Sequence, residues 1–313
     1  MGPCIDLMSE ALASLARGEA LLPLRTVLRL PAGRSAFAAM PAVLGSAIGA
    51  KVITVFPENA STPYESHIGV VLYFDDVNGR LLAIVDASSV TAIRTAAVSG
   101  LATRLLARTD ATDLAILGTG IQAMTHLEAM RCVREIQRVR VWSRSTENGE
   151  HLAAAALQAW GIVVEVSPTA QAAVKDAHII CTTTASREPV VEHAWLAPGV
   201  HINAVGASVA TARELDTSTV VASRLYVDRR ESAMAESGDF LIPRDEGAIS
   251  NEHIVGELGD LVLGRAASRT SAEQITLFKS LGLAIEDIAS ARFIYEQALV
   301  SGAGTWIDIG GLR

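Results

Sequence analysis

The sequence predicts an α/β protein in which a doubly wound parallel sheet is joined to a second domain with antiparallel strands. Two observations lead to this prediction. From Asp113 onward, short and fully apolar segments alternate with stretches whose apolar residues have helical spacing, which is typical of parallel strands covered by helices on both faces. Before residue 108, apolar segments are separated by Gly, Pro and Asn, and two of them flank an Asn-Gly turn.

The N-terminal region has the pattern of an antiparallel sheet followed by a helix. Strands are predicted over residues 51–56, 70–74 and 81–85. The intervening sequence Asp-Asp-Val-Asn-Gly predicts a hairpin between the second and third of these strands. A helix is predicted over residues 90–107, with Ser88 or Ser89 as its N-cap.

The second region predicts alternating strands and helices. Strands are expected over 114–117, 139–142, 163–166, 178–182, 200–205 and 225–228, and helices over 121–133, 147–160 and 171–176. One long amphipathic helix is predicted over 276–299. The predicted division is a domain over 1–107, completed by 276–313, and a parallel-sheet domain over 108–275.

Composition narrows the class of protein. Half of the 313 residues are hydrophobic and 19% are charged, as in a globular enzyme. The formal net charge of -8 argues against nucleic-acid binding, which needs clustered Lys and Arg. Three widely spaced cysteines without a C-x-x-C pair argue against zinc or a disulfide framework, and the histidines lack metal-ligand spacing. Without a signal peptide or an apolar segment of membrane-spanning length, we expect a cytoplasmic protein with no membrane partner.

A glycine-rich segment follows the first strand of the alternating region. Gly118-Thr-Gly120-Ile-Gln-Ala123 stands between a predicted strand and a predicted helix. Gly118 permits a tight turn, Gly120 permits close approach of the pyrophosphate, and Ala123 keeps the helix near the sheet. The strand before it, the helix after it and the next strand at the expected distance favour a dinucleotide site over a purely structural turn.

The end of the second strand indicates which dinucleotide is bound. NAD sites usually carry Asp or Glu there, to accept a hydrogen bond from the ribose 2′-hydroxyl. This chain instead has Ser143, Arg144 and Ser145, which can donate to a 2′-phosphate. The sequence therefore favours NADPH, with NADH as a weaker cofactor.

Several motifs together resemble the ornithine cyclodeaminase/μ-crystallin family, which includes ketimine reductases, alanine dehydrogenases and amino-acid cyclodeaminases. The resemblance covers nearly the whole chain. It implies an N-terminal substrate and dimerisation domain, completed by the C-terminal helix, around an inserted Rossmann domain, and so a homodimer. The motifs are KVITVFPEN at 51–59, TAIRTAA at 91–97, GTGIQA at 118–123, HINAVGAS at 201–208, RELD at 213–216, ELG at 257–259 and FKSLG at 278–282.

The resemblance also implies the site residues. Arg25, Lys51 and Arg94 would bind the substrate carboxylate, which a guanidinium can clamp with two hydrogen bonds. Lys51 and Ser208 would act in catalysis. The expected cofactor-binding residues are Thr95, Gly118, Gly120, Ile121, Gln122, Ser143, Arg144, Ser145, Asn148, Thr182, Thr183, Thr184, Val205 and Ser208.

Ser208 separates two activities of the family. Members that release ammonia from ornithine typically have Asp at this position, and a serine hydroxyl is a poor general base at neutral pH. The sequence therefore predicts NADPH-dependent reduction of a cyclic α-imino acid, Δ1-pyrroline-2-carboxylate or Δ1-piperideine-2-carboxylate, to L-proline or L-pipecolate. Lys51 or a bound water would supply the proton. The alternatives are ornithine cyclodeaminase, alanine dehydrogenase, or an NADP-binding protein without catalysis.

Overall fold

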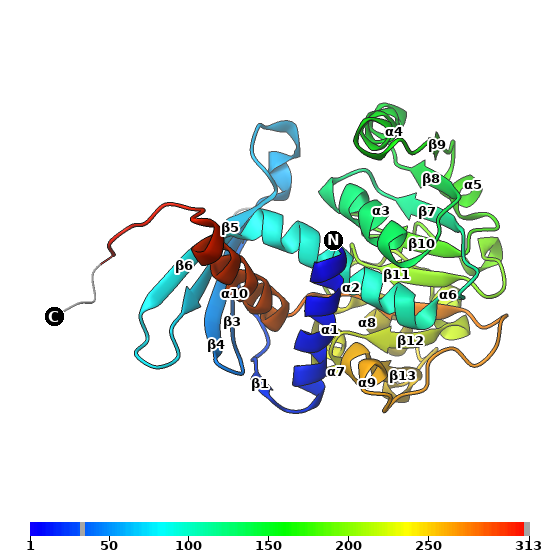
Figure 1. Cartoon of the computed structure of the whole chain (residues 1–313). Coiled ribbons are helices and arrows are strands. Elements are labelled where there is room, and N and C mark those ends of the chain that lie inside the picture. The colour runs from blue at the N-terminus through cyan, green and yellow to red at the C-terminus, as the bar shows by residue number, and fades with distance from the viewer. Residues whose placement is uncertain (32–34, 310–313) are drawn as a thin grey trace. The chain divides into compact units, whose positions relative to one another are not determined.

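The computed structural model describes residues 1–31 and 35–309, and for Ala60 and Ser61 it describes the backbone only. The chain divides into two compact units, whose elements are labelled in Figure 1. Unit 1 contains Met1–Asp6 and Thr95–Gly282, and unit 2 contains Leu7–Arg94 and Leu283–Arg313. The divisions fall inside helices α1 (Gly2–Ala16) and α2 (Ala87–Leu106), and directly before helix α10 (Ala284–Ser301).

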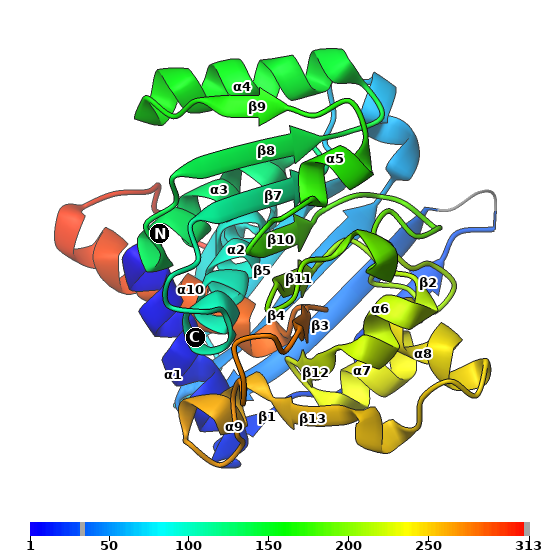
Figure 2. The same cartoon turned by 90° about the vertical axis from the view of Figure 1, so that its right-hand side faces the viewer.

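Unit 1 is built on an eight-stranded sheet in which every neighbouring pair is parallel, as Figure 2 shows. The prediction of a doubly wound parallel sheet is confirmed. In spatial order, the strands are β13 (Ile254–Glu257), β12 (Arg224–Val227), β14 (Thr276–Lys279), β11 (His201–Ala204), β10 (Ile179–Thr182), β7 (Asp113–Leu117), β8 (Arg138–Trp142) and β9 (Val164–Val166).

Helices connect these strands. The α-helices are α3 (Ile121–Val133), α4 (Thr146–Trp160), α5 (Ala170–Val174), α6 (Thr217–Ala222), α7 (Arg230–Glu236), α8 (Gly238–Asp245) and α9 (Leu258–Val262). Short 3-10 helices are η2 (His193–Trp195) and η3 (Asn251–His253). Strand order reverses between β7 and β10, because the chain runs outward from β7 to β9 and then returns to the other side of β7. Ligands of such sheets bind beyond the carboxyl ends of the strands at this point.

Strand β7 shows why the sequence forms a buried parallel sheet. Leu114 and Ile116 belong to one hydrophobic cluster, and Ala115 and Leu117 belong to another. Since successive side chains of a strand point to opposite faces, the two clusters are the cores on the two sides of the sheet. A fully apolar strand is the expected result of covering both faces.

Unit 2 contains an antiparallel sheet in the order β1-β3-β4-β5-β6, with β2 also paired to β3. The predicted hairpin is confirmed as β5 and β6. Helix α10 packs on β3, β4 and β5 through its first half, in which residues 284–291 are buried. The strands are β1 (Ala20–Leu21), β2 (Thr26–Arg29), β3 (Ala36–Leu44), β4 (Ala47–Val55), β5 (His67–Phe74) and β6 (Leu81–Asp86), and η1 is Pro57–Ser61.

The prediction of one helix over 276–299 is wrong. Residues 276–279 form β14, which pairs with β11 and β12 and is buried at every position. Gly282 has a φ of +78°, so the chain turns in a left-handed conformation before α10 begins at Ala284. The apolar residues of β14 and α10 together have helical spacing, although only α10 is a helix.

The predicted N-cap of α2 is also wrong. The helix begins at Ala87, and Asp86 Oδ2 accepts a hydrogen bond from the Ser89 backbone N–H at 2.7 Å. Asp86 therefore performs the capping. The Ser88 hydroxyl donates instead to the backbone carbonyl of His67 at 2.8 Å.

The sequence also argues against membrane-spanning segments, metal sites and disulfides, and the structure bears on each. Over the described residues, no helix is long and apolar enough to cross a membrane. In the same part of the chain, no group of His, Cys, Asp and Glu side chains is arranged to hold a metal ion. Cys4, Cys132 and Cys181, all within the described ranges, form no disulfide.

Candidate cofactor and substrate sites

The glycine-rich loop joins β7 to α3 in unit 1. Gly118 has a φ of +115°, and a Cβ there would lie only 2.7 Å from the Thr183 carbonyl oxygen. A Cβ on Gly120, in contrast, would meet no atom within 4 Å. In the described part of the chain, no side chain caps the 13-residue helix α3 that starts after Gly120. The open space beside an uncapped helix N-terminus fits the pyrophosphate of a dinucleotide.

The tip of β8 contains the residues predicted to select the dinucleotide. The Ser143 hydroxyl donates to the Ser145 carbonyl at 2.6 Å, and Ser145 Oγ caps α4 by accepting from the Asn148 backbone N–H at 3.3 Å. The two serines therefore fix the shape of the loop. Arg144 lies between them and is exposed, as is Asn148. The guanidinium is thus available to a ligand phosphate.

The segments that follow β10 and β11 carry the residues predicted for the nicotinamide half. The Val205 backbone N–H donates to the Thr182 carbonyl at 3.0 Å, and the Thr183 hydroxyl donates to the Leu117 carbonyl at 3.1 Å. Thr182 is buried, whereas Ser208 is exposed. These contacts bring the ends of β7, β10 and β11 together in one loop cluster.

Glu214, which the sequence analysis did not assign, lies at the centre of this loop cluster. Its Oε1 accepts hydrogen bonds from the backbone N–H and the hydroxyl of Thr184, at 2.7 and 2.6 Å. Its Oε2 accepts from the Thr182 hydroxyl and from the Gly206 backbone N–H, both at 2.7 Å. Burial raises the pKa of Glu214 above its ordinary value. Its presence in the RELD motif was the available sequence signal.

Of the remaining predicted cofactor residues, Ile121 and Gln122 begin α3, whereas Thr95 is on α2. Thr95 is buried, and Ile121 is 58% exposed. Gln122 forms part of the first turn of α3, where its carbonyl lies 2.7 Å from Nδ1 of the buried His126.

Unit 2 contains a cluster of four buried charged side chains, one of which is Lys51. Lys51 is on β4, Arg94 is on α2, and Glu286 and Asp287 are in the first turn of α10. Lys51 Nζ is 2.7 Å from Asp287 Oδ2. Arg94 donates from Nε to Asp287 Oδ1 at 2.9 Å and from Nη1 to Glu286 Oε2 at 2.8 Å. Two of the guanidinium N–H groups of Arg94 are therefore committed to the protein's own carboxylates.

The burial of this cluster changes the acidity of its members. Desolvation, together with the nearby positive charge of Arg94, lowers the pKa of Lys51 to about 8. Burial acts to raise the pKa of Asp287, but Arg94 and Lys51 outweigh it and bring this pKa below its ordinary value. An ammonium with a pKa near neutrality is suited to donating a proton.

Arg25, the third predicted carboxylate ligand, is half-buried in unit 2. Its positive charge contributes to lowering the pKa of Lys51, which places it in the same electrostatic environment. Sequence motifs indicated Lys51 and Arg94 but not Glu286 and Asp287. Two adjacent acids in a segment predicted to be helical resembled an ordinary solvated face.

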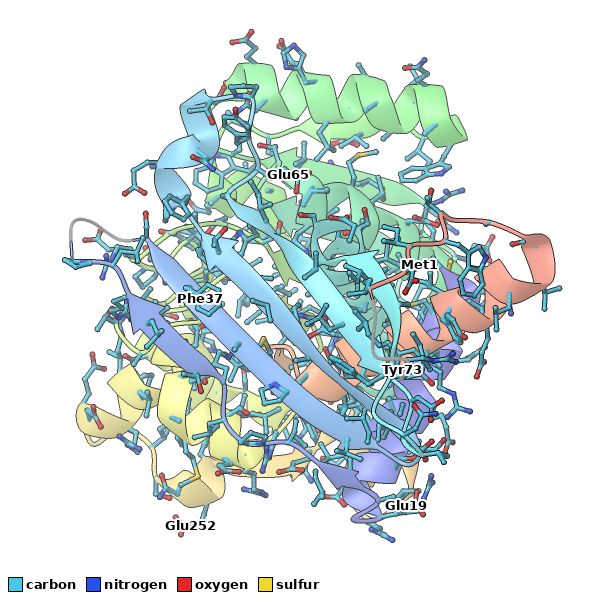
Figure 3. The ribbon with its side chains drawn as sticks, turned by 90° about the vertical axis from the view of Figure 1, so that its left-hand side faces the viewer. Met1, Glu19, Phe37, Glu65, Tyr73 and Glu252 are labelled. Carbon is cyan, nitrogen blue, oxygen red and sulfur yellow. The ribbon has the colours of Figure 1, made fainter. Side chains whose placement is uncertain are left out.

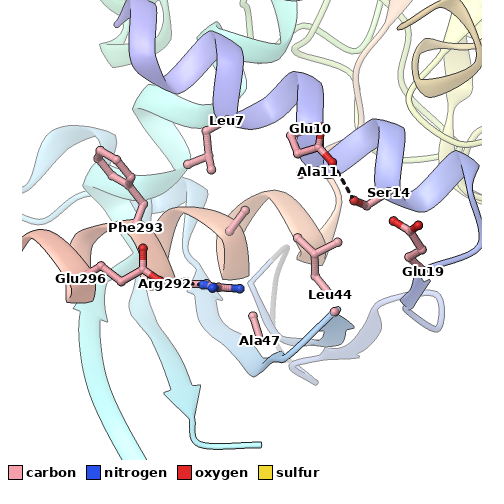
Figure 4. A pocket seen from close by; sticks show the side chains of 12 residues that line it. Leu7, Glu10, Ala11, Ser14, Glu19, Leu44, Ala47, Arg292, Phe293 and Glu296 are labelled. Carbon is pink, nitrogen blue, oxygen red and sulfur yellow. Dashed lines mark hydrogen bonds and ion pairs between the residues drawn. The ribbon is translucent and has the colours of Figure 1, made fainter. Parts of the chain in front are cut away.

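A groove elsewhere in unit 2 is visible in Figure 4. It has a volume of about 310 Å³. The residues around it are Leu7, Glu10, Ala11, Ser14, Glu19, Leu44, Gly45, Ala47, Ala289, Arg292, Phe293 and Glu296. None of these residues is among those predicted for the substrate or cofactor.

Comparison with known proteins identifies the family of the chain. The model of the ornithine cyclodeaminase/mu-crystallin family matches residues 1–302. The chain belongs to this family. It is 39% identical to ketimine reductase mu-crystallin of Mus musculus over 295 residues, which cover 93% of this chain and 90% of the relative.

Two solved structures of the family have the same fold over nearly the whole chain. One is Δ1-pyrroline-2-carboxylate reductase of Thermococcus litoralis in complex with NADH and L-proline, at 38% identity and a TM-score of 0.95, covering 97% of this chain and 95% of that one. The other is an archaeal alanine dehydrogenase dimer with bound NAD, at 31% identity and a TM-score of 0.93, covering 98% and 94%.

Proposed function

We propose that this family member uses a reduced nicotinamide dinucleotide to reduce the C=N bond of small cyclic α-imino acids. The substrates would be Δ1-pyrroline-2-carboxylate and Δ1-piperideine-2-carboxylate, and the products L-proline and L-pipecolate. The observation that carries the proposal is the buried Lys51 ammonium, held beside two arginines in a chain that also has a dinucleotide loop. Its similarity to a ketimine reductase and to a pyrroline-2-carboxylate reductase supports this reaction over others.

The residues of unit 2 have distinct tasks in this reaction. The positive charges of Arg25, Lys51 and Arg94 attract the single carboxylate of the substrate. A reduced dinucleotide held at the loop of Gly118 and Gly120 would supply the hydride for the imine carbon. Lys51 donates a proton to the imine nitrogen, which makes the imine carbon more electrophilic. The neutral amine of Lys51 then regains a proton from water. Asp287 keeps the ammonium in place at 2.7 Å.

The preference for NADPH over NADH is part of the proposal. It is supported by the exposed Arg144 at the tip of β8, where no acid is available to a ribose 2′-hydroxyl. Nicotinamide cofactors without the 2′-phosphate are named for the similar solved structures, so NADH is the competing choice. Binding measurements with both reduced cofactors separate them.

Ser208 supports reduction rather than release of ammonia from an amino acid. Its side chain is exposed, and a hydroxyl near pH 7 contributes little of the roughly 10²–10⁴-fold that a positioned general base supplies. Ornithine cyclodeaminase and alanine dehydrogenase remain alternatives within the family, and cofactor binding without catalysis is the non-enzymatic one. The test is a panel of cyclic imines, L-ornithine and L-alanine, assayed with both cofactors in both oxidation states.

A homodimer is also proposed, on the basis of an apolar face of the unit 2 sheet. Strand pairing places Leu28, Phe37, Thr54 and Ile68 in one cross-strand row. Leu28, Phe37 and Ile68 are 59%, 38% and 45% exposed. Figure 3 shows this sheet with Phe37 labelled. A second copy of the chain would cover the row, and we expect the dimer to be cytoplasmic.

A further inference from the structure

Glu214 has no part in the reaction described above, yet it is buried and both of its carboxylate oxygens accept hydrogen bonds. It is 0% exposed and receives four hydrogen bonds, two on each carboxylate oxygen. The donors belong to Thr182, the last residue of β10, to Thr184, just after β10, and to Gly206, after β11. One side chain therefore joins two loops that are separate along the sequence.

Each carboxylate oxygen of Glu214 faces a backbone N–H group, which can donate a hydrogen bond but cannot accept one. The Thr184 N–H points to Oε1 and the Gly206 N–H points to Oε2. An amide side chain would turn its NH2 group toward one of these N–H groups, leaving two donors facing each other. The position thus requires a carboxylate rather than any polar group of the same shape.

The neighbouring backbone is shaped around this carboxylate. A Cβ on Gly206 would lie 2.6 Å from Glu214 Oε1, so a larger residue there would displace the acid. Asp239 Oδ1 accepts hydrogen bonds from the backbone N–H groups of Glu214 and Leu215, at 2.8 and 3.1 Å. Lys279 Nζ is 3.0 Å from Asp239 Oδ2. The buried Lys279–Asp239 ion pair therefore helps to fix the backbone that carries Glu214.

The strand order indicates which half of a dinucleotide these loops meet. In a doubly wound sheet, the two mononucleotide halves of the ligand lie on either side of the point where strand order reverses. The glycine-rich loop and the tip of β8 are on the side of β7, β8 and β9, where the adenosine half would lie. The loops held by Glu214 follow β10 and β11, on the other side.

We propose that Glu214 is a positioning residue for the nicotinamide half of the cofactor. It holds the Thr184 and Gly206 backbone N–H groups and the Thr182 hydroxyl in place before the cofactor binds. The proposal rests on the proposed nicotinamide cofactor. Loss of the Glu214 carboxylate should weaken binding of the nicotinamide half but not of the adenosine half, because the adenosine half would contact other loops of the same unit.

The test compares whole cofactor with a fragment that lacks nicotinamide. The Kd values of purified wild type and Glu214→Gln are measured by calorimetry for NADPH and 2′-phospho-ADP-ribose, and in parallel for NADH and ADP-ribose. We expect the variant to bind the reduced dinucleotide at least about tenfold more weakly and the fragment within about twofold of wild type, since hydrogen bonds to a charged group are lost on one side only. Equal weakening of both ligands, or of neither, would overturn the proposal.

Glu246→Gln is the matched control. Glu246 also accepts hydrogen bonds within unit 1, from Thr217 and from Arg213, but its side chain is 44% exposed. We expect it to change neither Kd. Wild-type protein that bound neither NADPH nor NADH would contradict the proposed function instead, so the two failures are distinguishable.

A second measurement needs no variant. Hydrogen exchange of the wild-type protein without cofactor reports directly on the Thr184 and Gly206 backbone amides. Since Glu214 accepts from both, we expect them to exchange much more slowly than exposed loop amides. Exchange at the rate of an exposed amide would show that Glu214 does not hold these loops, and would overturn the proposal even if Glu214→Gln failed to fold.

Discussion

Asp287 lies with one carboxylate oxygen 2.7 Å from the Lys51 ammonium and with the other 2.9 Å from Arg94 Nε. The carboxylate therefore bridges two buried cations. Desolvation and Arg94 lower the pKa of Lys51, whereas Asp287 raises it. The proton on Lys51 depends on this balance.

The first prediction concerns the pH dependence of reduction. Because Lys51 is protonated below its pKa of about 8, the rate should be retained below that pH and fall as the pH rises through it. The charged groups facing Lys51 are Arg25, Arg94 and Asp287, Glu286 pairs with Arg94, and the titratable His67 lies nearby with its pKa lowered by burial and by Lys51. A rate profile of kcat/KM against pH measures the effect, and an unchanged rate well above pH 8 would contradict a role for the Lys51 proton.

Asp287→Asn should move the same limb of the profile to lower pH. The substitution removes the charge that raises the pKa of Lys51, so the ammonium loses its proton earlier. Competitive labelling of the Lys51 amine at different pH values, read by mass spectrometry, gives its pKa independently of turnover. The expected result is a lower value in the variant, and a higher or identical one would refute the assignment.

Arg94→Met should destabilise the protein as well as impair catalysis. The buried carboxylates of Glu286 and Asp287 would lose their hydrogen-bonded partner, and breaking a buried ion pair costs about 3–5 kcal/mol. Arg104→Met is the control, since Arg104 is on the same helix but pairs at the surface with Asp6. Urea unfolding of both variants measures the difference. Equal stability of the two would mean that Arg94 is not held by α10.

Arg144→Asp should shift cofactor preference from NADPH toward NADH. The new carboxylate would repel a 2′-phosphate and accept from a 2′-hydroxyl at the tip of β8. The ratio of kcat/KM for the two cofactors measures the change. A wild-type enzyme that already preferred NADH would show that the serines and arginine of this loop do not recognise the phosphate.

Phe37→Lys should weaken the proposed dimer. It places a charge in the apolar row of the unit 2 sheet, whereas Val77→Lys places one in the β5–β6 turn, where the side chain is already 87% exposed. Analytical ultracentrifugation should find wild type and Val77→Lys as dimers and Phe37→Lys shifted toward monomer. Wild-type protein that sedimented as a monomer at micromolar concentration would contradict the proposed dimer.

The strands of unit 1 could be predicted because both faces of the sheet are covered. Leu114 to Leu117 are all buried, so the sequence shows an apolar segment of strand length between turn signals. The strand at residues 276–279 could not be predicted in this way. Its first and last residues, Thr276 and Lys279, are polar in sequence although both are buried in the structure. Lys279 is buried because Asp239, distant in the sequence, neutralises it. Helix α1 was missed although its apolar positions, Met8 and Leu12 among them, have helical spacing.

The candidate site shows the same limit. Motifs identified Lys51, Arg94 and the glycine-rich loop, since these residue types have direct ligand chemistry. Glu214 and Asp287 act on other residues of the chain, and their partners come from different elements. Only the folded chain brings such pairs together, so local sequence carries little signal for them.

The most direct test of the central claim is the fate of the cofactor's hydride. Wild-type enzyme is given Δ1-pyrroline-2-carboxylate with NADPH deuterated at the transferable position, and the product is analysed by chiral chromatography and mass spectrometry. We expect L-proline with a single deuterium at the carbon that carries the carboxylate. Unlabelled product, or no proline together with ready release of ammonia from L-ornithine and NAD⁺, would contradict it.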